Sequence, residues 1–322
     1  MADDRSKGFY ILIGKIRIMK ILLAILTLCF FSVTSVYGAD VVDERTKIYD
    51  VINNPAFKDF GRLIFPVNKS YYHGSSLGDL QLTWYTNIKP ARTVEIVNYM
   101  LSQVQQGCKI FYSIYPENDS RSKNIGLFFF RGNKNAKFAI CNAGGGFVYV
   151  GAMHDSFPHA LELSKRGYNA FALIYRQGSE AACEDLAGAI AFIHDNASEL
   201  EVDVNNYSLW GGSAGARMAA WLGTYGTESF GEKIYPRPSA VIMQYTGLSE
   251  VTGNEPPTYN CVGTNDGIAS YHIMQNRIDR IRANGTDAEI EIFDGLSHGF
   301  GLGEGTVAEG WLDRAVNFWE RQ

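Results

Sequence analysis

The most constraining feature of the chain is a regular alternation of apolar, strand-like runs with helical segments, which begins at Cys108. Several of the runs are apolar on both faces, as the buried strands of a parallel sheet must be. The alternation predicts an α/β fold, with one eight-stranded, mostly parallel sheet and helices on both of its faces. The predicted strands are residues 110–115, 126–130, 138–141, 170–175, 207–210, 240–245, 259–262 and 288–293.

Helical segments separate most of these strands from the third onward. Their apolar residues recur at helical spacing, and Gly167 follows two cations as the expected C-cap of the first of them. The predicted helices are 157–166, 180–197, 216–222, 271–283 and a final helix that includes Val307, Trp311, Leu312 and Phe318.

Residues 40–107 differ from the rest of the chain. They mix aromatic and polar residues, with one helical stretch near 93–104 and no regular alternation. We therefore interpret them as an N-terminal extension, not an independent domain, attached to an α/β domain at 108–322.

The charge distribution argues against nucleic acid as a partner. The net charge is −5, from 29 basic and 34 acidic residues. Residues 1–39 hold five of the basic and two of the acidic residues, so the remainder has 24 against 32, a net charge of −8. Such a surface repels phosphate backbones and anionic lipid.

The first 39 residues are typical of a secretory signal. An apolar run at 21–33 follows Met19-Lys20, and small residues then lead to Val36 and Gly38, which predicts cleavage before Ala39. Met1 and Met19 are both candidate start residues. The sequence predicts export to the periplasm or the medium, with an uncleaved membrane anchor at 21–39 as the alternative.

The four cysteines beyond this segment are Cys108, Cys141, Cys183 and Cys261. No pair of them has metal-ligand or redox spacing, so the sequence predicts neither a metal site nor a thioredoxin-like motif. Cys141 and Cys261 lie in strand-like runs, where they are expected to pack as small apolar residues. A disulfide is compatible with export, and the sequence leaves its pairing open.

The strongest local signal is the run Gly211-Gly212-Ser213-Ala214-Gly215, which joins a predicted strand to a predicted helix. Gly-x-Ser-x-Gly between strand and helix is typical of a nucleophilic serine on a strained turn. The N-terminus of the following helix directs backbone N–H groups toward developing negative charge. We predict Ser213 as a catalytic nucleophile; the alternative is a plain glycine-rich turn.

A nucleophilic serine needs a base, and the base needs a carboxylate that orients it. His298 lies in a loop beyond the last predicted strand, and Asp266 follows the strand before it. Asp294 and Glu304 are nearer to His298 in sequence, but neighbouring strand ends bring Asp266 and His298 together. We predict this pair as orienter and base; the alternatives are a capping aspartate and a backbone-bound turn histidine.

Three consecutive glycines follow the third predicted strand, in Asn142-Ala143-Gly144-Gly145-Gly146-Phe147. Glycines there let backbone N–H groups face a reacting carbonyl without obstruction. Together with the N–H of Ala214, those of Gly144 and Gly145 are the predicted oxyanion hole. A dinucleotide-binding loop is the alternative, but it needs a further glycine where Tyr149 stands.

These motifs resemble the α/β-hydrolase superfamily over about residues 108–322. The three glycines and Gly-Gly-Ser-Ala-Gly look like the branch that contains acetyl esterases and acetyl-xylan or feruloyl esterases. Hormone-sensitive-lipase-like members have His before the three glycines, where this chain has Ala143. The resemblance implies Ser213 as nucleophile, His298 as base, Asp266 as orienter, and Gly144, Gly145 and Ala214 as oxyanion donors.

The expected function is hydrolysis of short-chain, acetyl-like acyl esters without cofactor or metal, with a small molecule or a carbohydrate as the alcohol. Ser213 and Asp266 are only 53 positions apart in sequence. This leaves little or no room for a cap between them, so we expect an open site. The acyl group, the alcohol, the oligomeric state and the role of residues 40–107 stay open.

Two other functions are compatible with the fold. A serine peptidase of the prolyl-oligopeptidase type shares the Ser…Asp…His order, but the extension is too short for the propeller domain of that class. A non-catalytic binding protein would be expected to have lost part of the triad, whereas all three residues are present.

Overall fold

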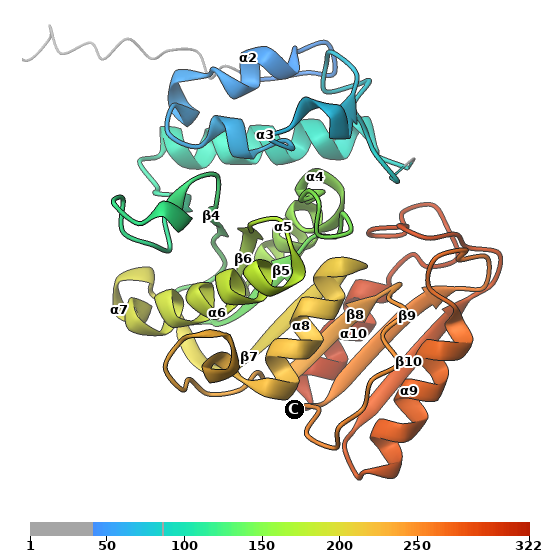
Figure 1. Ribbon diagram of the computed structural model, residues 1–322. Coiled ribbons are helices and arrows are strands. Elements are labelled where there is room, and N and C mark those ends of the chain that lie inside the picture. Colours follow the sequence, from blue (N-terminus) through green and yellow to red (C-terminus); the bar gives the residue numbers. More distant parts are fainter. Residues whose placement is uncertain (1–40, 86) are drawn as a thin grey trace, which may run out of the picture. The chain divides into compact units, whose positions relative to one another are not determined.

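The computed structural model describes residues 41–85 and 87–322 (Figure 1). The predicted signal or anchor at 1–39 lies outside the described residues, and export stays a prediction. Within the described ranges, no helix has both the length and the apolar character needed to cross a membrane.

An eight-stranded sheet forms the centre of the described unit (Figure 1). Its order is β10-β9-β8-β7-β5-β6-β4-β3. The strands from β10 to β6 are parallel, and β4 and β3 are antiparallel to their neighbours. This confirms the predicted mostly parallel sheet. The strands are β3 Phe111–Tyr112, β4 Gly126–Phe130, β5 Lys137–Asn142, β6 Asn169–Ile174, β7 Asp203–Gly212, β8 Ala240–Gln244, β9 Thr258–Gly263 and β10 Ala288–Phe293.

Helices cover both faces of the sheet because its central strands are apolar on both sides. In β4, Phe128 and Phe130 belong to one hydrophobic cluster, and Leu127 and Phe129 belong to another. Side chains alternate between the two faces of a strand, so one short run supplies both cores.

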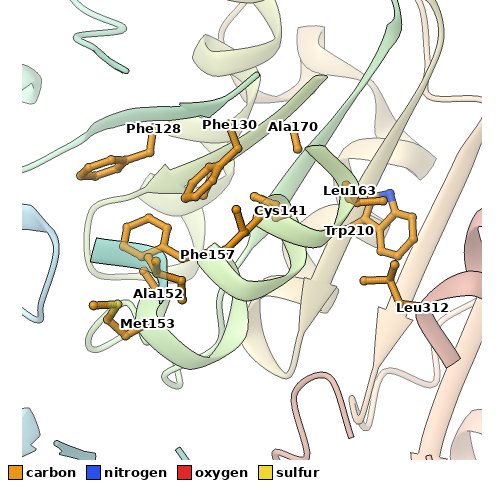
Figure 2. Close-up of a cluster of buried hydrophobic side chains, with 14 of the residues drawn as sticks. Phe128, Phe130, Cys141, Ala152, Met153, Phe157, Leu163, Ala170, Trp210 and Leu312 are labelled. Carbon is orange, nitrogen blue, oxygen red and sulfur yellow. The ribbon is translucent and has the colours of Figure 1, made fainter. Parts of the chain in front are cut away.

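The cluster that includes Phe128 and Phe130 lies against α5, Phe157–Lys165, and α10, Trp311–Glu320 (Figure 2). The other cluster packs against α6, Ser179–Asp195, and α8, Ala214–Tyr225. A third, smaller cluster joins α9, Tyr271–Ala283, to β10. Shorter elements complete this part: α4 Ala152–Asp155, α7 Ala197–Leu200, and the 3₁₀ turns η4 Ser120–Ser122 and η5 Thr227–Phe230.

The N-terminal extension packs its apolar residues into the same core. The helix α3, Pro90–Gln105, contributes Ile96, Val97 and Met100 to the cluster that includes α5. Arg92 of α3 forms an ion pair with Glu162 of α5 at 2.6 Å. The other elements are α2 Ile48–Ile52, β1 Tyr72–His73, β2 Gln81–Leu82, and the turns η1 Pro55–Phe57, η2 Gly61–Leu63 and η3 Lys69–Tyr71.

One helix prediction needs correction. Val307 lies before α10 and is 65% exposed, although the sequence predicted it inside the last helix. Gly310, at φ 80°, has the left-handed conformation directly before the helix, and Gly303 and Gly305 have positive φ as well. These glycines form a looped segment instead of an extra helical turn.

The four cysteines of the described ranges are all free thiols, and three of them are buried. Cys141 and Cys261 are in the hydrophobic cluster, as predicted. Burial raises the pKa of the Cys183 thiol to about 12, which makes it a poor nucleophile at neutral pH.

Candidate active site

Ser213 lies on a strained turn between β7 and α8. Its φ of 52° and ψ of −115° are uncommon for a residue with a side chain, and its N–H donates to the Gln244 carbonyl at 3.0 Å. A Cβ on Gly211 would collide with the backbone of Gly215, and one on Gly215 would collide with that of Asn142. The glycines of the motif therefore permit close packing of strand, helix and the preceding loop.

The structure brings Ser213, His298 and Asp266 together. The Nε2 atom of His298 lies 3.1 Å from Ser213 Oγ, and its Nδ1 atom lies 2.8 Å from Asp266 Oδ2. His298 and Asp266 follow β10 and β9, which are parallel neighbours, so their loops meet at one edge of the sheet. The His298 side chain is 11% exposed, and that of Asp266 is fully buried.

Asp266 is fixed by backbone donors as well as by the histidine. Its Oδ1 atom accepts hydrogen bonds from the N–H groups of Ile268, at 2.8 Å, and Ala269, at 2.7 Å. Asp266 does not cap the next helix, the alternative role considered from the sequence, because Ser270 is the N-cap of α9 and Asp266 bonds only the turn before it. A carboxylate held at both oxygens gives the imidazole one orientation.

The loop of three glycines after β5, Gly144–Gly146, which we call the glycine loop, differs from the prediction at one position. The Gly144 N–H donates to Asp155 Oδ2 at 2.7 Å, so it does not face Ser213. Within the described ranges, the N–H groups of Gly145, Gly146 and Ala214 have no hydrogen-bond partner. Gly145 and Gly146 also line the pocket beside the serine. Gly146 therefore replaces Gly144 among the candidate oxyanion donors.

Asp155 is the centre of a buried polar cluster that the sequence did not predict. Its carboxyl group accepts hydrogen bonds from the hydroxyls of Tyr85, at 2.9 Å, and Tyr245, and from the N–H of Gly144. A Cβ on Gly212, next to Ser213, would collide with this carboxyl group. These residues are scattered over 160 positions of sequence and form no motif. We call them the Asp155 cluster.

Burial, with Asp155 alongside, raises the pKa of both phenols well above the usual range. The phenols of Tyr85 and Tyr245 therefore keep their protons and remain hydrogen-bond donors. His154 supports the loop that contains His298, since its Nε2 atom donates to the Gly299 carbonyl at 2.8 Å. Burial lowers the pKa of His154, which favours its neutral form.

A pocket of about 230 Å³ opens at the serine; we call it the catalytic pocket. Two of its walls, Trp84 and Tyr85, come from the N-terminal extension. No local pattern in the sequence marks this contribution. The pocket is lined by Trp84, Tyr85, Gly145, Gly146, Ser213, Ile268 and His298.

Comparisons with known proteins find a matching family model and solved structures with a similar fold. Residues 130–272 match the model of BD-FAE, an esterase family of the α/β-hydrolase type. An esterase from Thermogutta terrifontis, solved with propionate bound, is similar with a TM-score of 0.55 and 20% identity over 66% of this chain and 93% of that one. The chain has the α/β-hydrolase fold.

Two further solved structures share this fold. An acetyl ester-xyloside bifunctional hydrolase from Caldicellulosiruptor lactoaceticus matches this chain with a TM-score of 0.58 and 19% identity, over 66% of this chain and 95% of that one. The α/β-hydrolase MGS-M1, from a deep-sea metagenome of the Medee basin, matches with a TM-score of 0.53 and 20% identity, over 66% and 96%. A search of curated proteins finds no match. The match to the BD-FAE esterase family supports the predicted class, a carboxylic ester hydrolase.

Proposed function

We propose that this α/β-hydrolase is a serine esterase that removes short acyl groups from carbohydrate esters by acyl transfer through Ser213. One observation carries the proposal. The side chains of Ser213, His298 and Asp266 form a continuous hydrogen-bonded chain that ends in a solvent-accessible pocket. This is the geometry that nucleophilic catalysis by a serine hydroxyl requires.

The first step forms an acyl-enzyme. Ser213 Oγ attacks the ester carbonyl carbon while His298 Nε2 takes the hydroxyl proton. Asp266 stabilises the imidazolium that forms. The bond from the carbonyl carbon to the alcohol oxygen then breaks, and His298 delivers its proton to the departing alcohol.

The second step releases the acid. Water loses a proton to His298 as it attacks the acyl carbon. The bond from that carbon to Ser213 Oγ then breaks, the acid leaves, and the imidazole passes the proton taken from water to Ser213 Oγ. In both steps negative charge develops on the carbonyl oxygen, where the free N–H groups of Gly145, Gly146 and Ala214 can receive it. Each such donor is worth about 10²–10³ in rate in known serine hydrolases.

Short acyl groups are supported by the size and surroundings of the catalytic pocket. Its volume is about 230 Å³, and the segment between Ser213 and Asp266 forms only α8, η5, β8 and β9. No cap domain rises from this segment, so a bulky alcohol has access to the serine. The acetyl ester-xyloside hydrolase among the similar structures supports a carbohydrate alcohol, and the signal-like N-terminus supports export.

The test compares the purified wild-type protein with Ser213→Ala on p-nitrophenyl acetate, butyrate and octanoate, with a prolyl anilide as the peptidase control. We expect turnover that favours acetate and a loss of about 10⁴-fold or more in the variant, with an unchanged melting temperature. Equal activity in both proteins, or none in either folded protein, contradicts the triad assignment. Cleavage of the anilide in preference to the esters indicates a peptidase.

A further inference from the structure

Trp84 is a large apolar side chain that is 55% exposed on a strained turn. The turn follows β2 and is closed by a hydrogen bond from the Tyr85 N–H to the Leu82 carbonyl, at 3.0 Å. Trp84 has a φ of 72°, in the left-handed region where glycine or asparagine is favoured and a bulky aromatic is strained. Core packing explains neither the exposure nor the strain, and such strain is concentrated at functional sites.

The turn is fixed to the active site on both sides of Trp84. On one side, the Tyr149 hydroxyl donates to the Thr83 carbonyl. On the other side, Tyr85 donates to Asp155 in the Asp155 cluster. The indole ring itself lies against the glycine loop, since a Cβ on Gly146 would be 3.1 Å from its Cζ3 atom. An exposed aromatic face is thus held rigidly beside Ser213.

A second hollow, of about 380 Å³, is linked to this tryptophan through their shared neighbour, Tyr149. Tyr149 forms part of its wall, with its ring 5.8 Å from that of Trp84 and stacked at 4.8 Å on that of Tyr71. The wall also includes Lys123 and Gln177. Within the described ranges, the side chains of these two residues have no hydrogen-bond or ion-pair partner. The hollow therefore offers aromatic surface together with free donors and an acceptor.

Aromatic faces beside free amide and ammonium groups are suited to sugar rings. The C–H bonds on the face of a pyranose are attracted to the electron-rich face of an indole, and its hydroxyls need hydrogen-bond partners. The second hollow is also within the volume range of small-molecule sites, about 300–1,000 Å³.

We propose that the N-terminal extension binds the saccharide of the substrate. Trp84 packs against the sugar unit that carries the acyl group, and the second hollow receives the neighbouring unit of the chain. This inference rests on the proposed function, because it assigns the alcohol side of the same site. It makes Trp84 a specificity-determining residue from a segment outside the matched family region.

The first experiment measures binding without catalysis. The Ser213→Ala protein is titrated with xylotriose, cellotriose and mannotriose by isothermal calorimetry, alone and combined with Trp84→Asn or Trp84→Phe. Asparagine tolerates the left-handed backbone, so the turn is retained while the ring is lost. We expect at least one trisaccharide to bind, a loss of about tenfold or more with asparagine, and a loss of less than threefold with phenylalanine.

Ile234→Asn is the matched control, because Ile234 is 79% exposed and lines neither hollow. It should bind the trisaccharides like the parent protein. Gln177→Ala tests the second hollow. We expect it to weaken binding of the trisaccharide severalfold while binding of the matching methyl glycoside stays within twofold.

Kinetics then separate this inference from the proposed function. On an acetylated trisaccharide, Trp84→Asn in the active protein should raise KM about tenfold and change kcat less than threefold. On butyl acetate, which has no ring, the rise in KM should be much smaller. Ester hydrolysis without binding of any trisaccharide, or equal losses on both substrates, overturns the inference alone. Saccharide binding without ester hydrolysis overturns only the proposed function.

Discussion

The two sides of Ser213 are each built around a buried carboxyl group, but the donors to these groups differ. On the side of the catalytic pocket, Asp266 accepts from His298 and from two backbone N–H groups. On the inner side, Asp155 accepts from two phenols and from the Gly144 N–H. An imidazole exchanges protons near neutral pH, whereas phenols with raised pKa values keep theirs. Aspartate therefore has two uses here: Asp266 assists proton transfer on one side, and Asp155 holds a fixed structure on the other.

This difference separates two kinds of defect. Replacement of the Asp266 carboxylate by an amide should abolish activity and leave stability unchanged, because the amide oxygen can still accept the hydrogen bonds of the surrounding turn. Loss of Asp155 should release the start of the glycine loop and leave buried donors without partners. Activity and stability measured on the same variants test this division.

The largest effect is expected for Asp266→Asn. The amide oxygen can still accept from Ile268 and Ala269, but the amide nitrogen then faces His298 and favours the wrong imidazole tautomer. We expect kcat on p-nitrophenyl acetate to fall about 10³–10⁴-fold, with little change in melting temperature.

Asp294→Asn is the matched control for this prediction. Asp294 is nearer to His298 in sequence, but it accepts a hydrogen bond from Thr264 at an exposed site. Its substitution should lower kcat less than threefold. If the two variants lose activity equally, or if Asp266→Asn loses less than tenfold, Asp266 is not the orienting residue.

The next effect is expected for Asp155→Ala, measured by urea unfolding. The substitution leaves two phenols and the Gly144 N–H buried without an acceptor, and each costs about 1–3 kcal/mol. We expect a total loss of about 3–5 kcal/mol in the free energy of unfolding. Asp155→Asn keeps one acceptor, and one phenol can rotate to accept from its amide, so its loss should be about half as large. A loss below about 1 kcal/mol for alanine would show that the cluster does not hold the loop.

The same comparison shows what the sequence could predict. The sheet and the positions of Ser213, Asp266 and His298 follow from local patterns, because parallel strands place successive loops at one edge. Nothing local marks Asp155, Tyr85 or Tyr245, which meet only through tertiary packing.

The glycine loop and the extension illustrate the same limit. Which of three glycines presents its N–H to the pocket depends on backbone torsions, such as the φ of 128° at Gly145. These torsions in turn depend on the acceptor for Gly144. The contribution of Trp84 to the catalytic pocket depends on how a segment without regular alternation packs against distant loops. Short sequence patterns therefore carry no information on the torsions of the glycine loop or on the packing of Trp84.

The smallest effect concerns pH and adds His159 to the inner side. His159 lines the same enclosed space as Asp155, and both of its ring nitrogens are buried without a hydrogen-bond partner in the described ranges. Burial lowers the pKa of His159 to about 4. Between about pH 6.5 and pH 4, the unfolded chain therefore binds a proton that the folded chain does not.

Because His159 is neutral in the folded state, its contribution to the free energy of unfolding is at its maximum above about pH 6.5. This contribution decreases as the pH falls toward 4, and at pH 5 it is lower by roughly 2 kcal/mol. In His159→Phe, which cannot titrate, the drop in the free energy of unfolding from pH 7 to pH 5 should be smaller than in the wild type by this amount. Between pH 7 and pH 8 the two proteins should show parallel stability. If the free energies of unfolding of the two proteins instead fall in parallel down to pH 5, His159 accepts a proton in the folded state. The inner side is then open to solvent, and it does not differ from the catalytic pocket in the way argued above.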